Sequence, residues 1–264
     1  MSLSAFLAQH RRPGAILVTL THAAGSTPRE AGAAMAVSLN ATAGTIGGGQ
    51  LEFHCLDIAR EMLASGERKR SLDIPLGPQM GQCCGGRVSV SLKRAGAADL
   101  AMLAASEKAE AAAQPAILIF GAGHTGRALV EALALLPLRI SLIDDRDGVL
   151  DGLPAAVTCI RMADPVAAIA AAPAGAAYVV LTHSHALDYR LTEAALQRGD
   201  TAYVGMIGSK TKRATFASFL EREGVGRESL DRLTLPIGGS TVKDKRPAVI
   251  AAMVTAELLG LLLR

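Results

Sequence analysis

The second half of the chain alternates short apolar runs with stretches of helical periodicity. The apolar runs predict strands at residues 117–120, 139–143, 157–161, 177–182 and 201–205. Between and after them, the periodicity predicts helices at residues 124–136, 165–171, 187–198 and 209–223. Strands that alternate with helices indicate a parallel, doubly wound sheet, which we expect over residues 116–264, ending in an apolar helix.

The first 95 residues show a different pattern. Branched apolar residues predict strands at residues 15–21 and 33–39, and alternation predicts another at 87–92, at an edge of its sheet. An apolar stripe that includes Leu51, Cys55 and Met62 predicts a helix. We therefore expect a small mixed α/β domain over residues 1–95.

An alanine-rich stretch separates these two regions. Residues 96–115 contain few large apolar side chains and end at Pro115. Because the residue before a proline avoids the helical conformation, the stretch is predicted to be a linker helix that ends there.

Composition narrows the class of protein. A chain of 264 residues can bury two ordinary cores, and 50% hydrophobic residues with 19% charged residues exclude a disordered chain. Aromatic residues make up 3%, Trp is absent and the net charge is only +3. These values leave little stacking surface or positive field for nucleic acid, so we expect no nucleic-acid partner.

Neither end of the chain predicts a membrane segment. Residues 1–14 lack an apolar stretch of the signal-peptide type. Residues 249–263 are apolar but contain Glu257, and they are fewer than the roughly 20 that a spanning helix needs. We expect a buried terminal helix, no membrane association and a cytoplasmic location, where the four cysteines stay reduced.

A glycine-rich turn follows the first strand of the second region. Gly121, Gly123 and Gly126 have the spacing of a dinucleotide-binding turn, and Asp144 ends the next strand. N–H groups at the helix start favour an anion, and Asp144 or Asp145 can accept hydrogen bonds from a ribose. The context predicts a Rossmann fold, which either binds a nucleotide or has kept only the architecture.

Two histidines, His183 and His185, follow the fourth strand of this region. Ligands bind at the carboxyl ends of strands in such sheets, so one imidazole is expected to face the cleft, with Asp188 to cap or orient it. As metal ligands the two histidines lack a third partner. The alternative is a capped turn with one structural histidine.

Three cations open the helix after the fifth strand. Lys210, Lys212 and Arg213 lie in or near its first turn, where positive charge opposes the helix dipole. The arrangement indicates a nearby anion, and the alternative is a solvated basic face.

Adjacent cysteines, Cys83 and Cys84, follow Gln82 in a glycine-rich segment. Neighbouring Cα atoms lie about 3.8 Å apart, closer than a disulfide prefers, and in a strand the two side chains point to opposite faces. One exposed thiolate that binds a soft metal or passes sulfur fits this pattern, and two buried small residues are the alternative. Cys55 and Cys159 lie in apolar patterns and are predicted core residues.

Two further features of the first region suit anions. Gly47, Gly48 and Gly49 precede a predicted helix, where exposed N–H groups can bind a phosphate. Arg29 ends a Gly-Ser-Thr-Pro-Arg turn and can pair with a phosphate through two hydrogen bonds. Neither feature alone specifies a ligand.

Taken in their order along the chain, these segments resemble the xanthine dehydrogenase accessory protein family, XdhC. The resemblance lies in residues 25–29 (GSTPR), 44–52 (GTIGGGQLE), 81–87 (GQCCGGR), 121–126 (GAGHTG), 182–188 (THSHALD), 203–213 (YVGMIGSKTKR), 235–238 (LPIG) and 247–252 (PAVIAA). These segments span nearly the whole chain. The paired cysteines among glycines, combined with a later Rossmann unit, make the resemblance specific.

The resemblance implies a carrier rather than a turnover enzyme. Members of the family bind molybdenum cofactor (molybdopterin with its metal), and they promote exchange of a terminal oxo ligand for sulfur from a cysteine desulfurase. They then deliver the cofactor to the molybdenum subunit of apo-xanthine dehydrogenase. The expected partners are therefore these two proteins, and the sequence is also compatible with a homodimer.

The resemblance also assigns residues, with no catalytic residue among them. Cys83 and Cys84 are the expected metal ligands. The cofactor-binding residues are expected among Arg29, Gly47, Gly48, Gly49, Gln82, Cys83, Cys84, Gly121, Gly123, Gly126, Asp144, His183 and His185.

Two other functions stay open. An NAD(P)-dependent oxidoreductase would use the turn at residues 121–126 and Asp144, with His183 or His185 as the acid–base group, although no proton relay is evident. A thiol redox or zinc-binding module would use the paired cysteines, but it lacks a second paired-ligand motif. For the Rossmann cleft, the sequence therefore leaves three alternatives: part of the cofactor, a separate nucleotide or no ligand.

Overall fold

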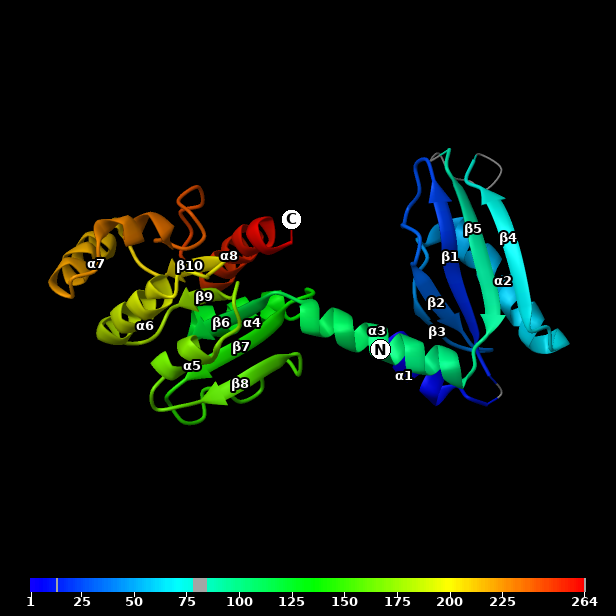
Figure 1. Cartoon of the computed structure of the whole chain (residues 1–264), viewed down its shortest axis with the longest axis horizontal. Helices are drawn as coiled ribbons and strands as arrows, with labels where there is room; N and C mark the ends of the chain where they lie inside the picture. The colour runs from blue at the N-terminus through cyan, green and yellow to red at the C-terminus, as the bar shows by residue number, and fades with distance from the viewer. Residues whose placement is uncertain (13, 78–84, 264) are drawn as a thin grey trace. The chain divides into compact units, whose positions relative to one another are not determined.

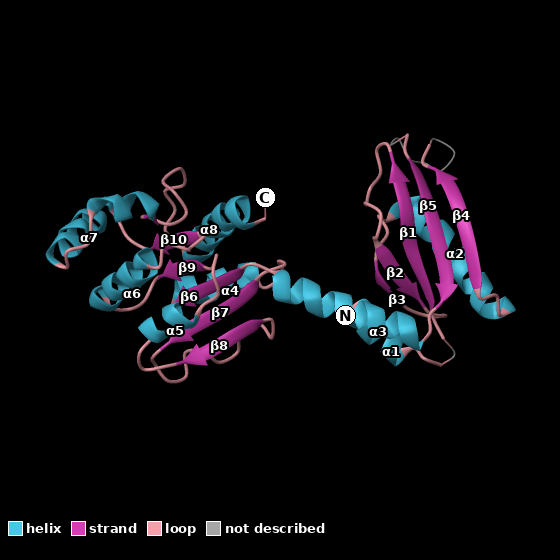
Figure 2. Ribbon diagram, in the orientation of Figure 1, coloured by secondary structure: helices cyan, strands magenta, loops and turns pink. Residues whose placement is uncertain are grey.

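The computed structural model describes residues 1–12, 14–77 and 85–263 of the chain. It divides into two compact units, Met1–Glu110 and Ala111–Arg264. Both units combine helices with one sheet, as Figures 1 and 2 show.

The first unit is built on an antiparallel sheet of five strands in the order β3-β2-β1-β5-β4. Helix α2 (Gly49–Ser65) covers one face and buries Leu51, Cys55 and Met62 against it (Figure 2). Helix α1 (Leu3–Gln9) packs near the other face through Phe6 and Leu7. The strands are β1 (Ile16–Ala24), β2 (Ala34–Val37), β3 (Thr42–Gly44), β4 (Lys69–Pro75) and β5 (Arg87–Arg94).

One expectation about this sheet is wrong. Strand β5 was expected at an edge, but it lies between β1 and β4. The edge strand is β4, which pairs with β5 from Lys69 to Pro75. Its side chains alternate in burial, but Leu72 and Ile74 are its only large apolar residues, too few to predict a strand.

Helix α3 (Ala97–Ala113) follows β5, and it contains no buried residue. Its Glu107 accepts hydrogen bonds from the backbone N–H and the hydroxyl of Ser4, which fixes this part of the helix to the start of α1. The two compact units divide near its C-terminal end, between Glu110 and Ala111.

The second unit is a Rossmann domain. Its six parallel strands have the order β11-β10-β9-β6-β7-β8, so the strand sequence reverses between β6 and β9. The strands are β6 (Ala116–Phe120), β7 (Arg139–Asp144), β8 (Val157–Arg161), β9 (Ala177–Val180), β10 (Tyr203–Met206) and β11 (Leu233–Thr234). The connecting helices are α4 (His124–Leu133), α5 (Val166–Ala171), α6 (His185–Gln197), α7 (Lys210–Arg222), η2 (Arg227–Arg232) and α8 (Pro247–Leu262).

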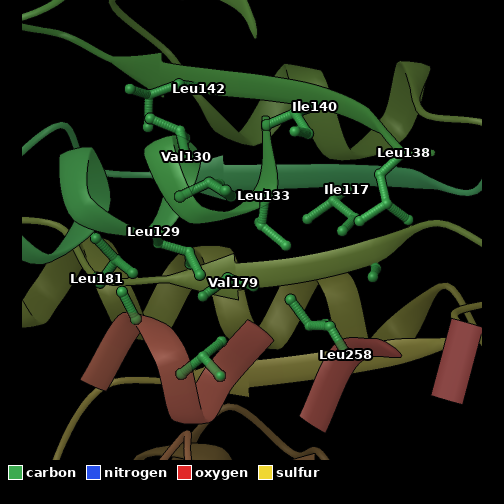
Figure 3. Close-up of a cluster of buried hydrophobic side chains, with 14 of the residues drawn as sticks. Ile117, Leu129, Val130, Leu133, Leu138, Ile140, Leu142, Val179, Leu181 and Leu258 are labelled. Atoms are coloured by element: carbon green, nitrogen blue, oxygen red, sulfur yellow. The ribbon is translucent and has the colours of Figure 1, made fainter. Parts of the chain in front are cut away.

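Side chains on opposite faces of this sheet enter separate cores. Ile117 and Ile119 pack with Leu129 and Leu133 of α4 and Leu258 of α8, and Figure 3 shows part of this cluster. On the other face, a second cluster is formed with α5, α6 and α7. Helices on both faces confirm the predicted doubly wound α/β architecture, and the N-terminal unit confirms the predicted small mixed domain.

Helix α8 packs into the Rossmann core through Ala251, Val254 and Leu258, as expected for the apolar end of the sequence. Among the helices in the described ranges, none combines the length and the apolar character that crossing a membrane requires.

Candidate functional site

Two motifs of the first unit meet where β1 ends and β5 begins. Ser26 forms an isolated β-bridge with Gly85, and a Cβ atom on Gly86 would lie 2.3 Å from the carbonyl oxygen of Ser26. Gly25, with φ +72, also approaches the Cα of Gly86. No side chain fits at Gly86, so the backbones of the two segments are in direct contact.

A third motif contacts the same loop. A Cβ atom on Gly47 would lie 2.6 Å from Cγ and 2.9 Å from Cβ of Pro28, and 3.6 Å from Cγ of Arg29. The loop that carries Pro28 and Arg29 therefore touches the glycine turn before α2 at one position and Gly85–Gly86 at another. Segments far apart in the sequence converge on this loop.

The glycine turn before α2 has its own hydrogen bonds. The Oε2 atom of Glu52 accepts bonds from the Thr45 hydroxyl (2.6 Å), the Gly48 N–H (3.1 Å) and the Ile46 N–H (3.2 Å). The Gly47 N–H donates to Thr45 Oγ1 (3.1 Å). These contacts were not predicted, and the capping-box spacing of three residues does not indicate them, because Glu52 lies four residues after the N-capping Gly48.

Arg29 lies at the surface of this arrangement. Its side chain is exposed, and residues 28–33 line an open depression of about 530 Å³. An exposed guanidinium beside an open depression is able to bind an anionic group from solution.

The predicted site residues Gln82, Cys83 and Cys84 lie outside the described residues. Their described neighbours in the sequence are Gly77 and Gly85, and Gly85 is the bridge partner of Ser26.

The other two cysteines differ from each other. Cys55 is fully buried, as predicted, and burial, followed by the charge of Glu52, raises the pKa of its thiol to about 12. The prediction that Cys159 is a core residue is wrong, because it is exposed on β8. Strand β8 is at the edge of the sheet, and only its Val157 side chain is buried.

In the Rossmann unit, two of the three predicted glycines are required by the fold. Gly121 has φ +112, and a Cβ there would lie 2.3 Å from the Leu181 carbonyl oxygen. A Cβ on Gly126 would lie 1.9 Å from the Gly121 carbonyl oxygen. Gly123 is different: its φ is −71°, and a Cβ there would meet no atom within 4 Å. Gly123 is the N-cap of α4, and because glycine has no side chain, no side-chain hydrogen bond caps this helix. The fold leaves open space at this position.

Asp144 lies at the end of β7 as predicted, but its oxygens already have partners. They accept bonds from the Ala122 N–H (2.7 Å), the Arg146 N–H (3.0 Å) and the Arg146 guanidinium (2.8 and 2.9 Å). Burial would raise the pKa of this carboxyl, but the bonds from Arg146 and Ala122 outweigh burial and hold the pKa well below its usual range. A ribose hydroxyl would therefore compete with Arg146 for Asp144.

The two predicted histidines are both exposed. Nδ1 of His183 lies 4.0 Å from Oδ1 of Asp145, across the ends of β9 and β7. His185 begins α6, after the N-cap Ser184. Asp188, which was expected to cap or orient an imidazole, instead bonds Thr182 and Lys212.

Two of the three cations at the start of α7 have internal partners. Lys212 Nζ donates to Asp188 Oδ2 (2.6 Å) and to the Ile207 carbonyl (2.9 Å). The Arg213 guanidinium donates to the carbonyls of Leu233 (3.0 Å) and Leu230 (2.8 Å). These contacts explain Lys212 and Arg213 without an anion, and Lys210 is exposed.

The crevice at the switch point of the sheet is narrow. A cavity of about 10 Å³ lies there, with walls that include Gly121, Asp144, Pro165 and Leu187. Such a volume accommodates about one water molecule. A nucleotide base in this crevice would require Pro165 or Leu187 to move.

A wider groove of about 900 Å³ lies in the same unit but includes none of the predicted site residues. Its walls are mainly apolar and come from strands β6 to β8 and helix α5, with Leu118, Ile160 and Ala168 among them. Within the described ranges, no group of three or more His, Cys, Asp or Glu side chains is arranged to hold a metal ion.

Comparison with known proteins matches both units to one family. A model described as the XdhC Rossmann domain matches residues 117–258, and a model of the XdhC and CoxI family matches residues 8–73. Among curated proteins, the chain is similar to the uncharacterized protein YqeB of Escherichia coli (strain K12), with 27% identity over 242 residues. The match covers 89% of this chain but only 41% of YqeB.

A solved structure shares the fold over its whole length. It comes from Bacillus halodurans, is described as a xanthine dehydrogenase, and aligns with a TM-score of 0.78. The alignment covers 99% of this chain and 96% of that one at 18% identity. At this identity, the match shows a shared fold.

Proposed function

The chain belongs to the XdhC family, and from this premise we propose that it is an accessory protein that binds molybdenum cofactor and assists maturation of xanthine dehydrogenase. The cofactor is cargo: the protein holds it while a cysteine desulfurase supplies the sulfur that replaces a terminal oxo ligand. The loaded cofactor then passes to the molybdenum subunit of the apoenzyme.

One observation carries this proposal furthest. The loop with Arg29 contacts Gly47 and Gly86, so the family's three N-terminal motifs lie together. An exposed guanidinium suits the phosphate of the cofactor, and a thiolate suits its metal or the incoming sulfur. We assign these roles to Arg29 and to Cys83 or Cys84, with Gln82 in the same segment.

Anaerobic co-purification tests the proposal. The protein is expressed in cells that make molybdenum cofactor, and molybdenum and pterin are quantified in the purified protein. We expect both in the wild type and in Cys159→Ala, whose exposed thiol lies in the Rossmann unit. The Cys83→Ala, Cys84→Ala double variant should contain neither. Full loading of this variant, together with an active target enzyme, would remove the paired cysteines from the mechanism.

The partners and the location are part of the same proposal. Free thiols at Cys83 and Cys84 require a reducing compartment, which the cytoplasm provides. Affinity capture with the purified desulfurase and with apo-xanthine dehydrogenase tests the two contacts, and light scattering tests the homodimer.

A nucleotide at the Rossmann turn is the second candidate, because Gly123 opens α4 and a Cβ there would meet no atom within 4 Å, which leaves room for a ligand. The occupied Asp144 and the narrow crevice count against a bound dinucleotide. Titration of wild type and Gly123→Val with NAD(H) and NADP(H) distinguishes these readings. Stoichiometric binding with hydride transfer to a small carbonyl would instead support an oxidoreductase.

A further inference from the structure

Hydrogen-bond donors of the glycine turn before α2 are already bonded to the carboxylate of Glu52. Three donors, two of them backbone N–H groups, converge on Glu52 Oε2, and a third backbone N–H bonds the Thr45 hydroxyl oxygen. An anion at the N–H groups of Ile46 and Gly48 would have to displace a carboxylate that carries the same charge. This turn is therefore poorly suited to bind a phosphate in the conformation observed.

The same hydrogen bonds shape the surface that receives Arg29. The positive φ values of Gly47 (+129°) and Gly48 (+73°) turn the chain sharply between Ile46 and α2. In this conformation Gly47 has no side chain to separate it from Pro28 and Arg29. Glu52 fixes the turn from within the first part of α2, and Ile46 fixes it from the core, where it is fully buried.

Arg29 itself is exposed, and the described residues give it no hydrogen bond or ion pair with another side chain. Its position therefore depends on the packing contacts of its loop. One of these contacts is the packing of Pro28 and Arg29 against Gly47.

We propose that Glu52 is a positioning residue: its carboxylate holds the glycine turn in the shape that presents Arg29 to the phosphate of the cargo. This inference rests on the proposed function for the identity of the ligand. It assigns phosphate binding to the Arg29 side chain rather than to the N–H groups of the turn.

The two assignments predict opposite effects of removing Glu52. If the turn bound the phosphate itself, Glu52→Ala would free three donors, remove a negative charge and tighten binding. If the turn positions Arg29, Glu52→Ala weakens binding by about tenfold, the change expected when one positioned hydrogen-bonding group is lost. Glu52→Gln keeps an acceptor oxygen, so its affinity should stay within about threefold of wild type.

The test uses the full chain and two readouts. Affinity is measured anaerobically with molybdenum cofactor released from a donor protein, for wild type, Glu52→Ala, Glu52→Gln and Arg29→Gln. Backbone amide chemical shifts of Gly47 and Arg29 report the loop without any ligand. We expect Glu52→Ala to change both the cofactor affinity and the two amide shifts, and Glu52→Gln to restore most of both. Arg29→Gln should lose affinity while the Gly47 amide shift stays as in the wild type.

Unchanged Arg29 and Gly47 shifts in a folded Glu52→Ala protein, or tighter binding by that variant, would overturn the inference. If the wild type binds no cofactor while the shifts respond as expected, the proposed function fails and the positioning role of Glu52 is upheld. Circular dichroism and the thermal midpoint confirm that each variant is folded.

Discussion

The Nζ atom of Lys212 lies 2.6 Å from Oδ2 of Asp188, and both side chains are buried at the carboxyl edge of the Rossmann sheet, with 10% and 1% of their surface exposed. Asp188 also accepts bonds from the N–H and hydroxyl of Thr182, and Lys212 also bonds the carbonyl of Ile207. The pair therefore joins the connections that follow β9 and β10.

Replacement of Lys212 by Met should strongly destabilise the Rossmann unit. The substitution leaves the Asp188 carboxylate buried without its cation, which typically costs about 3–5 kcal/mol. Chemical denaturation followed by circular dichroism measures the loss. Lys210→Met is the matched control on the same helix, because Lys210 is exposed, and it should change stability by no more than about 0.5 kcal/mol. Equal effects of the two substitutions would refute a structural role for the pair.

Substitution of Gly47 by Ala should disturb the loop that carries Arg29. The new Cβ would lie 2.6 and 2.9 Å from atoms of Pro28, whereas a Cβ on Gly48 would meet no atom within 4 Å. Both positions have a positive φ, so both variants carry a backbone cost. We expect Gly47→Ala to lose about 1–3 kcal/mol more than Gly48→Ala in thermal or chemical unfolding.

A second substitution checks the cause of that difference. Pro28→Gly removes both atoms that the new Cβ would contact. In the Gly47→Ala background it should recover stability, after correction for its effect in the wild type. Additive effects in this double-mutant cycle would mean that the Pro28 contact is not the cause.

Arg146→Met should destabilise the protein at neutral pH and less so in acid. Arg146 holds the pKa of Asp144 below its usual range, so the bond contributes stability above about pH 4 that is lost as pH falls toward the folded-state pKa. We expect a loss of about 2 kcal/mol at pH 7, less than for a fully buried pair because the Arg146 side chain is 39% exposed. Denaturation between pH 7 and 2 should show the difference from wild type shrinking below pH 4.

The chain supplies a matched control for this pair. Arg246 contacts Asp244 with the same spacing and also through its backbone N–H and guanidinium, but its side chain is 79% exposed. Arg246→Met should change stability far less than Arg146→Met at every pH in this range, because solvent screens the exposed pair. A loss as large as that of Arg146→Met would show that burial of Asp144 does not decide the effect.

Cys55 and Cys159 should differ in reactivity toward iodoacetamide at pH 8. Burial and Glu52 raise the pKa of Cys55 to about 12, so about one molecule in ten thousand carries its thiolate at this pH. Cys159 is exposed. Mass spectrometry of digested samples should show modification of Cys159 in the native protein and of Cys55 only after unfolding. Modification of native Cys55 would contradict its burial.

The sequence predicted the Rossmann unit well because its central strands are buried on both faces. All five residues of Ala116–Phe120 are buried, and the following glycines mark the turn into α4. The start of α7 was also predicted, and Ser209 caps it, whereas α6 begins at His185 after Ser184, two residues before the predicted start. Strand β4 was missed because Arg70 takes the first of its inward positions and leaves only Leu72 and Ile74 as large apolar residues.

The candidate site was less predictable, because its details depend on which side chains the fold brings together. The sequence indicated either a nearby anion or a solvated basic face for Lys212, but its partner Asp188 becomes a neighbour only when α6 and α7 are both in place. The contacts of Glu52 and Arg146 are local, yet the sequence does not specify the rotamers that form them. The meeting of Gly47 with Pro28 requires the backbone of the loop itself.

The contact between Ser26 and Gly85–Gly86 also bears on the order of events during synthesis. These residues are roughly sixty positions apart, so closing the contact costs much chain entropy, and a nascent chain forms it only after β5 has left the ribosome and paired with β1. Until then, the Arg29 loop has its packing against Gly47 but lacks its backbone contact with Gly85 and Gly86. On the proposed function, cargo loading would follow the folding of the complete N-terminal unit.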